Sequence, residues 1–315
     1  MNIGQHKLRP YPFERLRALR ERIRPSKEHT LIDLSIGEPK HQPPKFITNA
    51  LRDSVGKVCQ YPSTRGSSEL RNTIAGWIEN RFKLPSKILN PDTQILPANG
   101  TREALFGISQ VLVKAGSRQL IGMPNPFYQI YEGAAFLAGG EPYYFDCTEE
   151  NSFKPKWKDI PEPVWESLKI LYICSPGNPS GQVLDAADYE EIIKRADKHE
   201  FTIIADECYS EIYFDEEDPP LGLLQWCAEN DRHTFKRCIV VNSLSMRSNV
   251  PGLRSGFIAG DENIIEAFYQ YRTYQGGAMP LQVQVASAVA WRDEKHVVQN
   301  RQLYREKIET VTNIL

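Results

Sequence analysis

The sequence predicts an α/β protein whose core is a mostly parallel β-sheet with helices on both faces. Two observations support this class. Short apolar runs bounded by Pro, Gly, Asn or Asp alternate with amphipathic segments from about residue 94 to about residue 272. Strands that alternate with helices in this way are usually joined by crossovers into a parallel sheet. The predicted strands are residues 94–96, 119–122, 142–145, 168–174, 201–205, 238–242 and 255–259.

The segments between and around these strands complete the predicted layout. Apolar residues at helical spacing predict helices over 104–112 and 185–198, and further helices over 14–22 and 294–315. Residues 31–39 predict a short strand that ends in a turn. We expect an N-terminal arm with part of a small domain over 1–45, a large cofactor-binding domain over 46–292, and an interdomain helix over 293–315. The last helix has no C-cap signal, so a C-terminal small domain is expected to be missing.

Composition narrows the classes of function. The chain has 38 Lys+Arg against 40 Asp+Glu, and the scattered basic residues give no nucleic-acid or membrane surface. No apolar run approaches the length of a membrane span, and the N-terminus has no apolar leader segment. The six cysteines lack the spacing of metal ligands, which predicts reduced thiols, no metal site and a cytoplasmic protein.

Ligands of parallel sheets bind at the carboxyl ends of the strands, so polar residues there are the first candidates. Gly100 and Thr101 follow one strand and open a helix, where free N–H groups and the helix dipole favour an anion such as a phosphate. An ordinary N-cap is an equally good reading of Thr101. Arg254 begins a later strand, and its guanidinium can grip a phosphate with paired donors or form a plain surface ion pair.

Three further strand ends carry candidate groups. Asp206 ends an apolar strand, where a buried carboxylate needs a cation or several donors, although a turn or N-cap aspartate is the commoner case. Asn178 lies in a turn and can donate to a phenolate oxygen, whereas most Asn-Pro turns are only structural. Tyr128 can stack on a planar ring, and core filling is its usual alternative.

The order of these pieces along the chain resembles the fold-type I, aspartate-aminotransferase-like class of pyridoxal-phosphate (PLP) enzymes. Within that class the chain is most similar to succinyldiaminopimelate transaminase, on the segments YPFERLRAL, ADECYSEIYFDE, SLSMRSNVPGLRSGF and YRTYQGGAMP. The resemblance implies the PLP-transferase fold and amino transfer between N-succinyl-diaminopimelate and 2-oxoglutarate in lysine biosynthesis. Its implied partners are amino-acid and 2-oxo-acid substrates.

The resemblance also implies roles for particular residues. Asp206 pairs with the ring nitrogen, Tyr128 stacks on the ring, and Asn178 and Tyr209 meet its 3-oxygen. Gly37 lines the substrate carboxylate site, and the phosphate cup consists of Gly100, Thr101, Arg102, Ser243, Ser245 and Arg254. A further phosphate contact, Tyr61, comes from a neighbouring subunit, which implies a homodimer with shared active sites.

Met246 departs from this pattern, because it stands where the family has the lysine that links covalently to PLP. A thioether cannot form that link or shuttle a proton, and the neighbouring Arg247 stays protonated. The length and flexibility of methionine should preserve the fold. The methionine is compatible with an inactive paralogue, a substitution made to trap substrate, or a sequence variant. The alternative function is therefore a non-catalytic PLP-fold binding protein.

Overall fold

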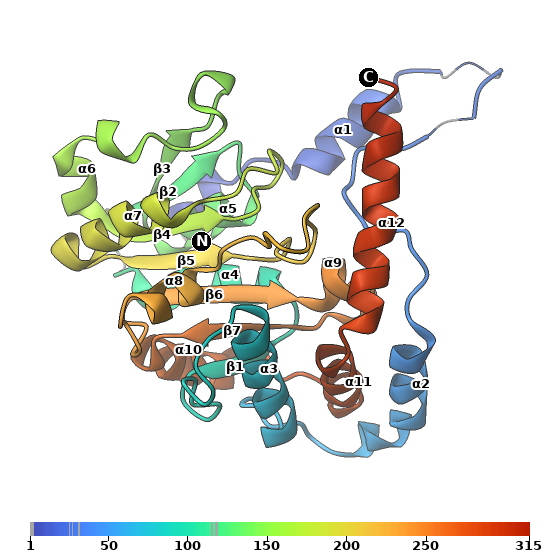
Figure 1. The fold of residues 1–315 in the computed structure, drawn as a ribbon. Helices are drawn as coiled ribbons and strands as arrows, with labels where there is room; N and C mark the ends of the chain where they lie inside the picture. Colours follow the sequence, from blue (N-terminus) through green and yellow to red (C-terminus); the bar gives the residue numbers. More distant parts are fainter. Residues whose placement is uncertain (1–2, 25, 27, 31, 115, 117–118) are drawn as a thin grey trace.

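The computed structural model describes residues 3–24, 26, 28–30, 32–114, 116 and 119–315. A seven-stranded sheet with the order β1-β7-β6-β5-β4-β2-β3 forms its centre (Figure 1). The seven strands predicted between residues 94 and 259 are confirmed, with ends shifted by at most a few residues. The strands are β1 (Ile95–Ala98), β2 (Leu120–Asn125), β3 (Glu141–Asp146), β4 (Leu168–Cys174), β5 (Thr202–Asp206), β6 (Cys238–Ser243) and β7 (Gly256–Gly260).

The sheet is mostly parallel, as predicted. Four of its pairings, from β3 through β2, β4 and β5 to β6, are parallel. Only β7 runs against its neighbours, β6 and β1. The parallel strands therefore end at one edge, and the segment that precedes β7 lies at that same edge.

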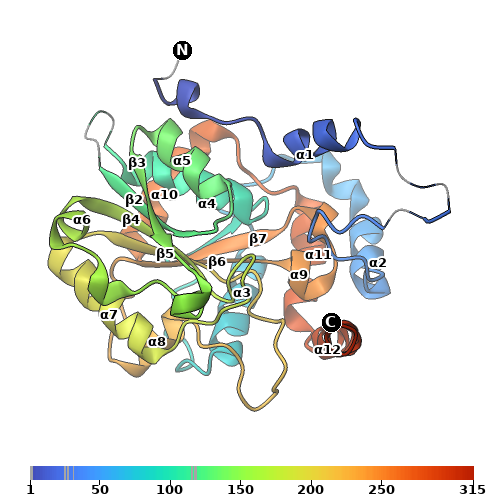
Figure 2. The same ribbon diagram turned by 90° about the horizontal axis from the view of Figure 1, so that it is seen from above.

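Helices cover both faces of the sheet (Figure 2). Along β5 the buried side chains alternate, with Ile203 and Ala205 in one apolar cluster and Ile204 in the other. The first cluster includes side chains of α3, α7, α8 and α11, and the second includes side chains of α4, α5 and α10. The helix bounds are α2 (Lys45–Asp53), α3 (Ser68–Arg81), α4 (Thr101–Leu112), α5 (Ile130–Ala138), α6 (Glu162–Ser167), α7 (Ala186–His199), α8 (Leu223–Glu229), α9 (Leu244–Ser248), α10 (Glu262–Gln275) and α11 (Leu281–Arg292).

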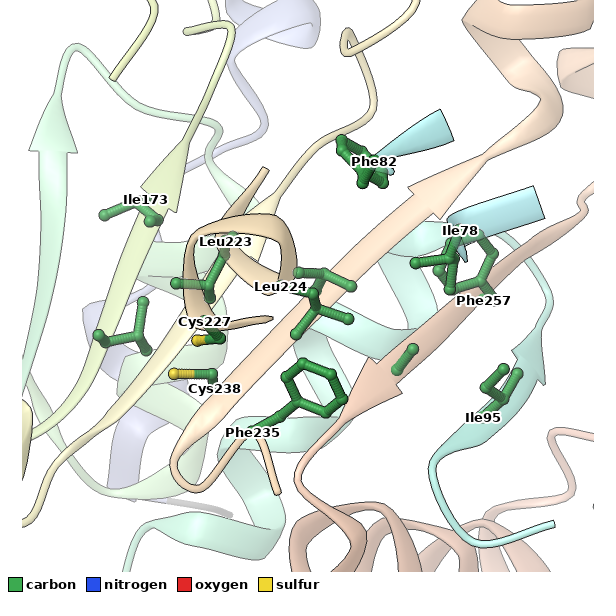
Figure 3. Packing of buried hydrophobic residues seen from close by; sticks show 14 of the residues in the cluster. Ile78, Phe82, Ile95, Ile173, Leu223, Leu224, Cys227, Phe235, Cys238 and Phe257 are labelled. Atoms are coloured by element: carbon green, nitrogen blue, oxygen red, sulfur yellow. The ribbon is translucent and has the colours of Figure 1, made fainter. Parts of the chain in front are cut away.

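The first cluster is continuous from α8 across the sheet to α3. Figure 3 shows Leu223, Leu224 and Cys227 of α8 next to Cys238 of β6, with Phe257 of β7 to their right. All five side chains are buried. This packing fixes the strands on which the site residues are carried, since a close-packed interior resists displacement of its members.

The terminal segments differ most from the prediction. The helices expected over 14–22 and 294–315 are α1 (Pro12–Arg20) and α12 (Lys295–Thr312). The strand predicted over 31–39 was wrong for residues 32–39, which form no strand, and Leu31 lies outside the described residues. Leu34 is 88% exposed and Ile36 is 58% exposed, so this apolar run has no neighbouring strand to pair with or surface to pack on.

The described residues contain neither a membrane span nor a cluster of metal ligands. None of their helices is both long enough and apolar enough to span a bilayer. No group of three or more His, Cys, Asp or Glu side chains among them could hold a metal ion.

Candidate active site

The register of the sheet brings the predicted site residues together at one edge. Cys174 at the end of β4 pairs with Asp206 at the end of β5. On the other side of β5, Ser243 at the end of β6 pairs with Gly256 of β7, which in turn pairs with Ala98 of β1. The turn after β1, the carboxylate after β5 and the segment after β6 are therefore neighbours.

Asp206 is a buried carboxylate without a cationic partner. Its Oδ2 accepts a hydrogen bond of 2.8 Å from the Tyr131 hydroxyl, and its Oδ1 accepts one of 3.3 Å from the Cys208 N–H. None of the ion pairs within the described ranges involves Asp206. Desolvation by burial raises the pKa of Asp206, and hydrogen bonds from the Tyr131 hydroxyl, the Cys208 thiol and the Cys208 N–H oppose this rise. Such a carboxylate is stabilised by a ligand cation at its remaining acceptor positions.

Tyr131 is a site residue that the sequence did not reveal. It lies in the first turn of α5, three residues beyond Tyr128, and is fully buried. Its ring stacks on Tyr172, with centroids 4.6 Å apart and planes 10° apart, which fixes the direction of its hydroxyl. The sequence signal for it is its position three residues after Tyr128, and the two rings lie edge to face with centroids 5.8 Å apart.

The turn between β1 and α4 approaches Arg254 closely. Gly100 has φ of 82°, and a Cβ there would lie 2.4 Å from the Arg254 Nη2. Nη2 of Arg254 donates to the Asn99 carbonyl at 3.5 Å, and its Nη1 donates to the Pro251 carbonyl at 3.0 Å. Only glycine leaves the backbone and the guanidinium this close, so the structure brings Gly100 and Arg254 together.

Hydroxyl groups from two strand ends lie beside the turn at Gly100. The Cys208 thiol lies 3.3 Å from the Thr101 Oγ1 and 3.7 Å from the Ser243 Oγ. The Ser245 N–H donates to the Ser243 Oγ at 3.3 Å. A Cβ on Gly256 would lie 2.6 Å from the Asn242 carbonyl oxygen, so a second glycine allows the start of β7 to lie close to the end of β6. Donor hydroxyls, backbone N–H groups and a guanidinium of this kind suit a phosphate.

Tyr128, which is predicted to stack on the cofactor ring, contacts Arg102 in the first turn of α4. The Arg102 Nε donates to the Tyr128 hydroxyl at 2.9 Å, and its Nη2 donates to the Tyr11 hydroxyl at 3.4 Å. Burial raises the pKa of Tyr128, with the Arg102 charge acting against this rise. Tyr11 is the second contact that sequence reasoning missed, although it lies in the N-terminal motif YPFERLRAL.

Asn178 and Tyr209 follow neighbouring strand ends. Asn178 lies four residues beyond Cys174, the residue of β4 that pairs with Asp206, and the Cys174 thiol donates to the Pro176 carbonyl of that turn at 3.3 Å. Burial is the main cause that raises the pKa of Tyr209, and Cys208, Cys174, Asp206 and Tyr128 add to it. The hydroxyl of Tyr209 therefore stays protonated at neutral pH and is available as a donor.

Met246 lies in α9, directly after β6, and is half-buried. The Asn300 side chain of α12 donates to the Met246 carbonyl at 2.9 Å. Arg247 is fully buried elsewhere. Its guanidinium carbon lies 5.4 Å from the ring centroid of Trp77 and 4.9 Å from that of Trp291. Its guanidinium also pairs with Glu294 and donates to the Ala290 carbonyl at 2.8 Å. Arg247 is thus committed to the core and cannot replace the missing amine.

Two predicted residues are not brought to the site within the described ranges. A Cβ at Gly37 would meet nothing within 4 Å. Tyr61 is fully exposed, at 103% of its reference surface, as a contact with a second subunit would require. Neither residue contacts another site residue in this chain.

The residues present are suited to bind the ring nitrogen and the phosphate of PLP. A cation-free buried carboxylate suits a pyridinium nitrogen, and the glycine-lined cup with Arg254 suits its phosphate. When bound, PLP supplies an electron sink for amino-acid chemistry. Position 246, however, offers no amine to hold the cofactor covalently.

Comparison with known proteins agrees with this geometry. The family model for aminotransferase class I and II matches residues 29–315. An LL-diaminopimelate aminotransferase of Natranaerobius thermophilus is 31% identical over 98% of this chain and 78% of its own length. Another from Trichormus variabilis is 30% identical over 92% of this chain and 72% of its own length.

Solved structures give the same result. A crystal structure of an aminotransferase from Neisseria meningitidis Z2491 has a TM-score of 0.94 and 47% identity, covering 100% of this chain and 79% of that one. An aminotransferase from Helicobacter pylori 26695 has a TM-score of 0.89 and 38% identity, covering 96% and 78%. The fold is thus the fold type I architecture implied by the sequence motifs. The chain belongs to the class I and II aminotransferases, which depend on PLP.

Proposed function

We propose that this chain holds PLP at the edge of the sheet by non-covalent contacts alone. Asp206 meets the ring nitrogen, Tyr128 stacks on the ring, and Asn178 and Tyr209 donate to its 3-oxygen. The phosphate lies between the Gly100 turn and Arg254, with Arg102, Thr101, Ser243 and Ser245 beside it. The observation that carries this proposal is the buried Asp206 carboxylate, which has donors but no cation among its described neighbours.

The reaction proposed for this site is amino transfer to 2-oxoglutarate from a diaminopimelate donor, with the N-succinylated form as the specific candidate. The motifs quoted above and the names of the 30–31% identical relatives support a diaminopimelate donor. Gly37 would line the substrate carboxylate site. Transfer requires a primary amine at position 246, because a thioether can neither accept nor deliver the α-proton. With Met246 in place, a PLP-binding protein without turnover is the second candidate.

The assembly proposed for this function is a homodimer in which Tyr61 reaches the partner's phosphate cup. Tyr61 is fully exposed and follows the 3-10 helix η2 (Val55–Cys59). Val55 and Val58 of that helix are 59% and 65% exposed, and such apolar surface favours burial against a second copy. Light scattering on wild-type protein and on Tyr61→Ala tests this assignment, since a monomeric wild type with full PLP affinity would contradict it.

A lysine at position 246 tests the functional proposal directly. The chain and its Met246→Lys variant are each mixed with PLP, reduced with borohydride, and examined by absorption and intact mass. We expect the Met246 chain to lose PLP on dialysis and to gain no mass, whereas the lysine variant retains it. The variant is also expected to convert 2-oxoglutarate to glutamate with a diaminopimelate donor.

Two results would contradict the proposal. Covalent capture of PLP by the Met246 chain would show that another amine serves the site. A lysine variant that binds no PLP would show that the pocket is misassigned. Turnover by the Met246 chain itself would exclude the second candidate.

A further inference from the structure

Arg272 is a fully buried arginine at the C-terminal end of α10, within the segment YRTYQGGAMP, and it has no role in the site described so far. Its Nε donates to the Glu103 Oε1 at 2.8 Å, and Glu103 lies in the first turn of α4. Its Nη1 donates to the Pro97 carbonyl at 2.6 Å, and its Nη2 donates to the Gly277 carbonyl. One side chain therefore joins α10, α4 and the end of β1.

Glu103 extends this network into the turn that approaches Arg254. The second oxygen of Glu103, Oε2, accepts the Asn99 N–H at 2.7 Å. The Asn99 side chain also donates to the Gly277 carbonyl at 3.2 Å. The turn of residues 97–100 is thus held at Pro97 by a guanidinium and at Asn99 by a carboxylate. No water is needed to complete these contacts, so the turn has little freedom to move.

Close backbone approach explains the glycines around the ion pair. A Cβ on Gly277 would lie 2.2 Å from the Glu103 Oε1 and 2.8 Å from the Arg272 Nε. A Cβ on Gly107 of α4 would lie 2.8 Å from the Phe268 ring of α10. The two helices, which lie side by side in Figure 2, therefore pack with the pair sealed between them.

Stability alone is a poor reason for such an arrangement. Removing two charges from water costs several kcal/mol per ion, and well-packed apolar residues are often as stable as a buried ion pair. The pair provides direction, because all three side-chain hydrogen bonds that it forms to other described residues end on backbone atoms of the turn or of Gly277. A fixed turn presents its free N–H groups to an anion without reorganisation.

We propose that Arg272 and Glu103 form a positioning pair that sets the Gly100–Thr101 backbone for the phosphate of PLP. The pair does not touch the cofactor and acts through the turn. This inference rests on the proposed placement of the phosphate at that turn. It assigns a role to the YRTYQGGAMP segment, which the functional proposal leaves without one.

Glu103→Gln is the variant that tests the pair. A glutamine replaces one of the two carboxylate oxygens by an NH2 group, so the position that accepts from Arg272 or the position that accepts from Asn99 becomes a donor. Dissociation constants of PLP and of pyridoxal, which lacks the phosphate, are measured by quenching of tryptophan fluorescence in the Met246 chain. We expect PLP to bind about 10- to 100-fold more weakly. Pyridoxal is expected to change by less than about 3-fold, since it makes no phosphate contact.

Arg272→Lys and Arg301→Gln complete the experiment. The lysine keeps the positive charge but lacks the planar, paired donors of the guanidinium. We therefore expect Arg272→Lys to bind PLP more weakly than the wild type, as Glu103→Gln does. Arg301 is a matched control, because it is a buried arginine that pairs with Glu216 and Glu211 away from the turn. Its substitution is expected to lower thermal stability while the ratio of PLP to pyridoxal affinity stays unchanged.

The outcomes separate the inference from the function on which it rests. Wild-type protein that binds PLP no better than pyridoxal would refute the placement of the phosphate. Wild-type protein that prefers PLP, with an unchanged preference in Glu103→Gln, would refute the positioning role. The same loss in the Arg301→Gln control would also refute it, because the loss would then follow general destabilisation. If Arg272→Lys fails to fold, the ratio in Glu103→Gln decides the question.

Discussion

Substitution of Tyr131 by phenylalanine isolates the electrostatic state of Asp206. The change removes the hydroxyl that donates to Oδ2 at 2.8 Å and keeps the ring that stacks on Tyr172 at 4.6 Å. Asp206 would then retain its bonds with Cys208, from the N–H at 3.3 Å and from the thiol. A hydrogen bond to a charged group is worth about 1.5–3 kcal/mol, so the free energy of unfolding without PLP should fall by about that amount at alkaline pH.

The pH dependence follows from the pKa of Asp206, which burial raises above its ordinary value of 3.8. Between the unfolded and the folded pKa, the folded state binds more protons, so stability falls as pH rises through that window. Loss of the Tyr131 donor raises the folded pKa further and extends the window upward. The deficit of Tyr131→Phe should therefore grow from about 1 kcal/mol, where Asp206 is protonated, to its full size above the folded pKa.

Tyr172→Phe is the matched control for this measurement. The Tyr172 hydroxyl donates to the Leu105 carbonyl at 2.6 Å and lies 2.7 Å from the Ser109 hydroxyl, both neutral partners. Burial raises the pKa of Tyr172, so its protonation does not change near neutrality. Denaturant unfolding of wild type and both variants at pH 5 and pH 8, without PLP, compares them. Equal deficits of Tyr131→Phe at the two pH values would refute the reasoning.

Three further substitutions test other parts of the site. Gly100→Ala would place a Cβ 2.4 Å from the Arg254 guanidinium at a residue whose φ is 82°. We expect a loss of about 1–3 kcal/mol in the free energy of unfolding and weaker PLP binding. Calorimetry that finds neither effect would contradict the close approach. Arg254→Lys loses paired donation, and titration should show PLP affinity about 10-fold lower with pyridoxal unaffected. Arg247→Met leaves the buried Ala290 carbonyl without its donor while Glu294 stays half-exposed, so we expect a loss of about 1–3 kcal/mol in unfolding experiments, with the ratio of PLP to pyridoxal affinity retained.

The sequence predicted the strands and strand-end residues because both are local patterns. Apolar runs bounded by turn residues mark β4 and β5, and the rule that ligands bind at strand ends then selects Asp206 and Gly100. The antiparallel direction of β7 was not predicted, since strand direction depends on how the connection crosses the sheet. The strand expected over 31–39 failed for its described part because a strand needs a partner, which no local pattern provides.

Contacts between distant segments explain the site residues that were missed. Tyr131 reaches Asp206 across 75 residues, and Arg272 reaches Glu103 across 169 residues. A tyrosine on a helix and an arginine near a helix end are common, so neither indicates a site by itself. Tyr61 and Gly37 remain predictions, because their proposed roles require a second subunit or a substrate.

Position 246 can lack its amine without loss of the rest of the site because each part is held by separate contacts. The Asp206 carboxylate is held by Tyr131 from α5, and the turn at Gly100 is held by Arg272 from α10. Helix α9, which carries Met246, is held through the buried Arg247 and through the bond from Asn300 to the Met246 carbonyl. None of these contacts uses the side chain at 246. A methionine of similar length therefore removes the covalent step while the binding surface that we assign to PLP stays in place.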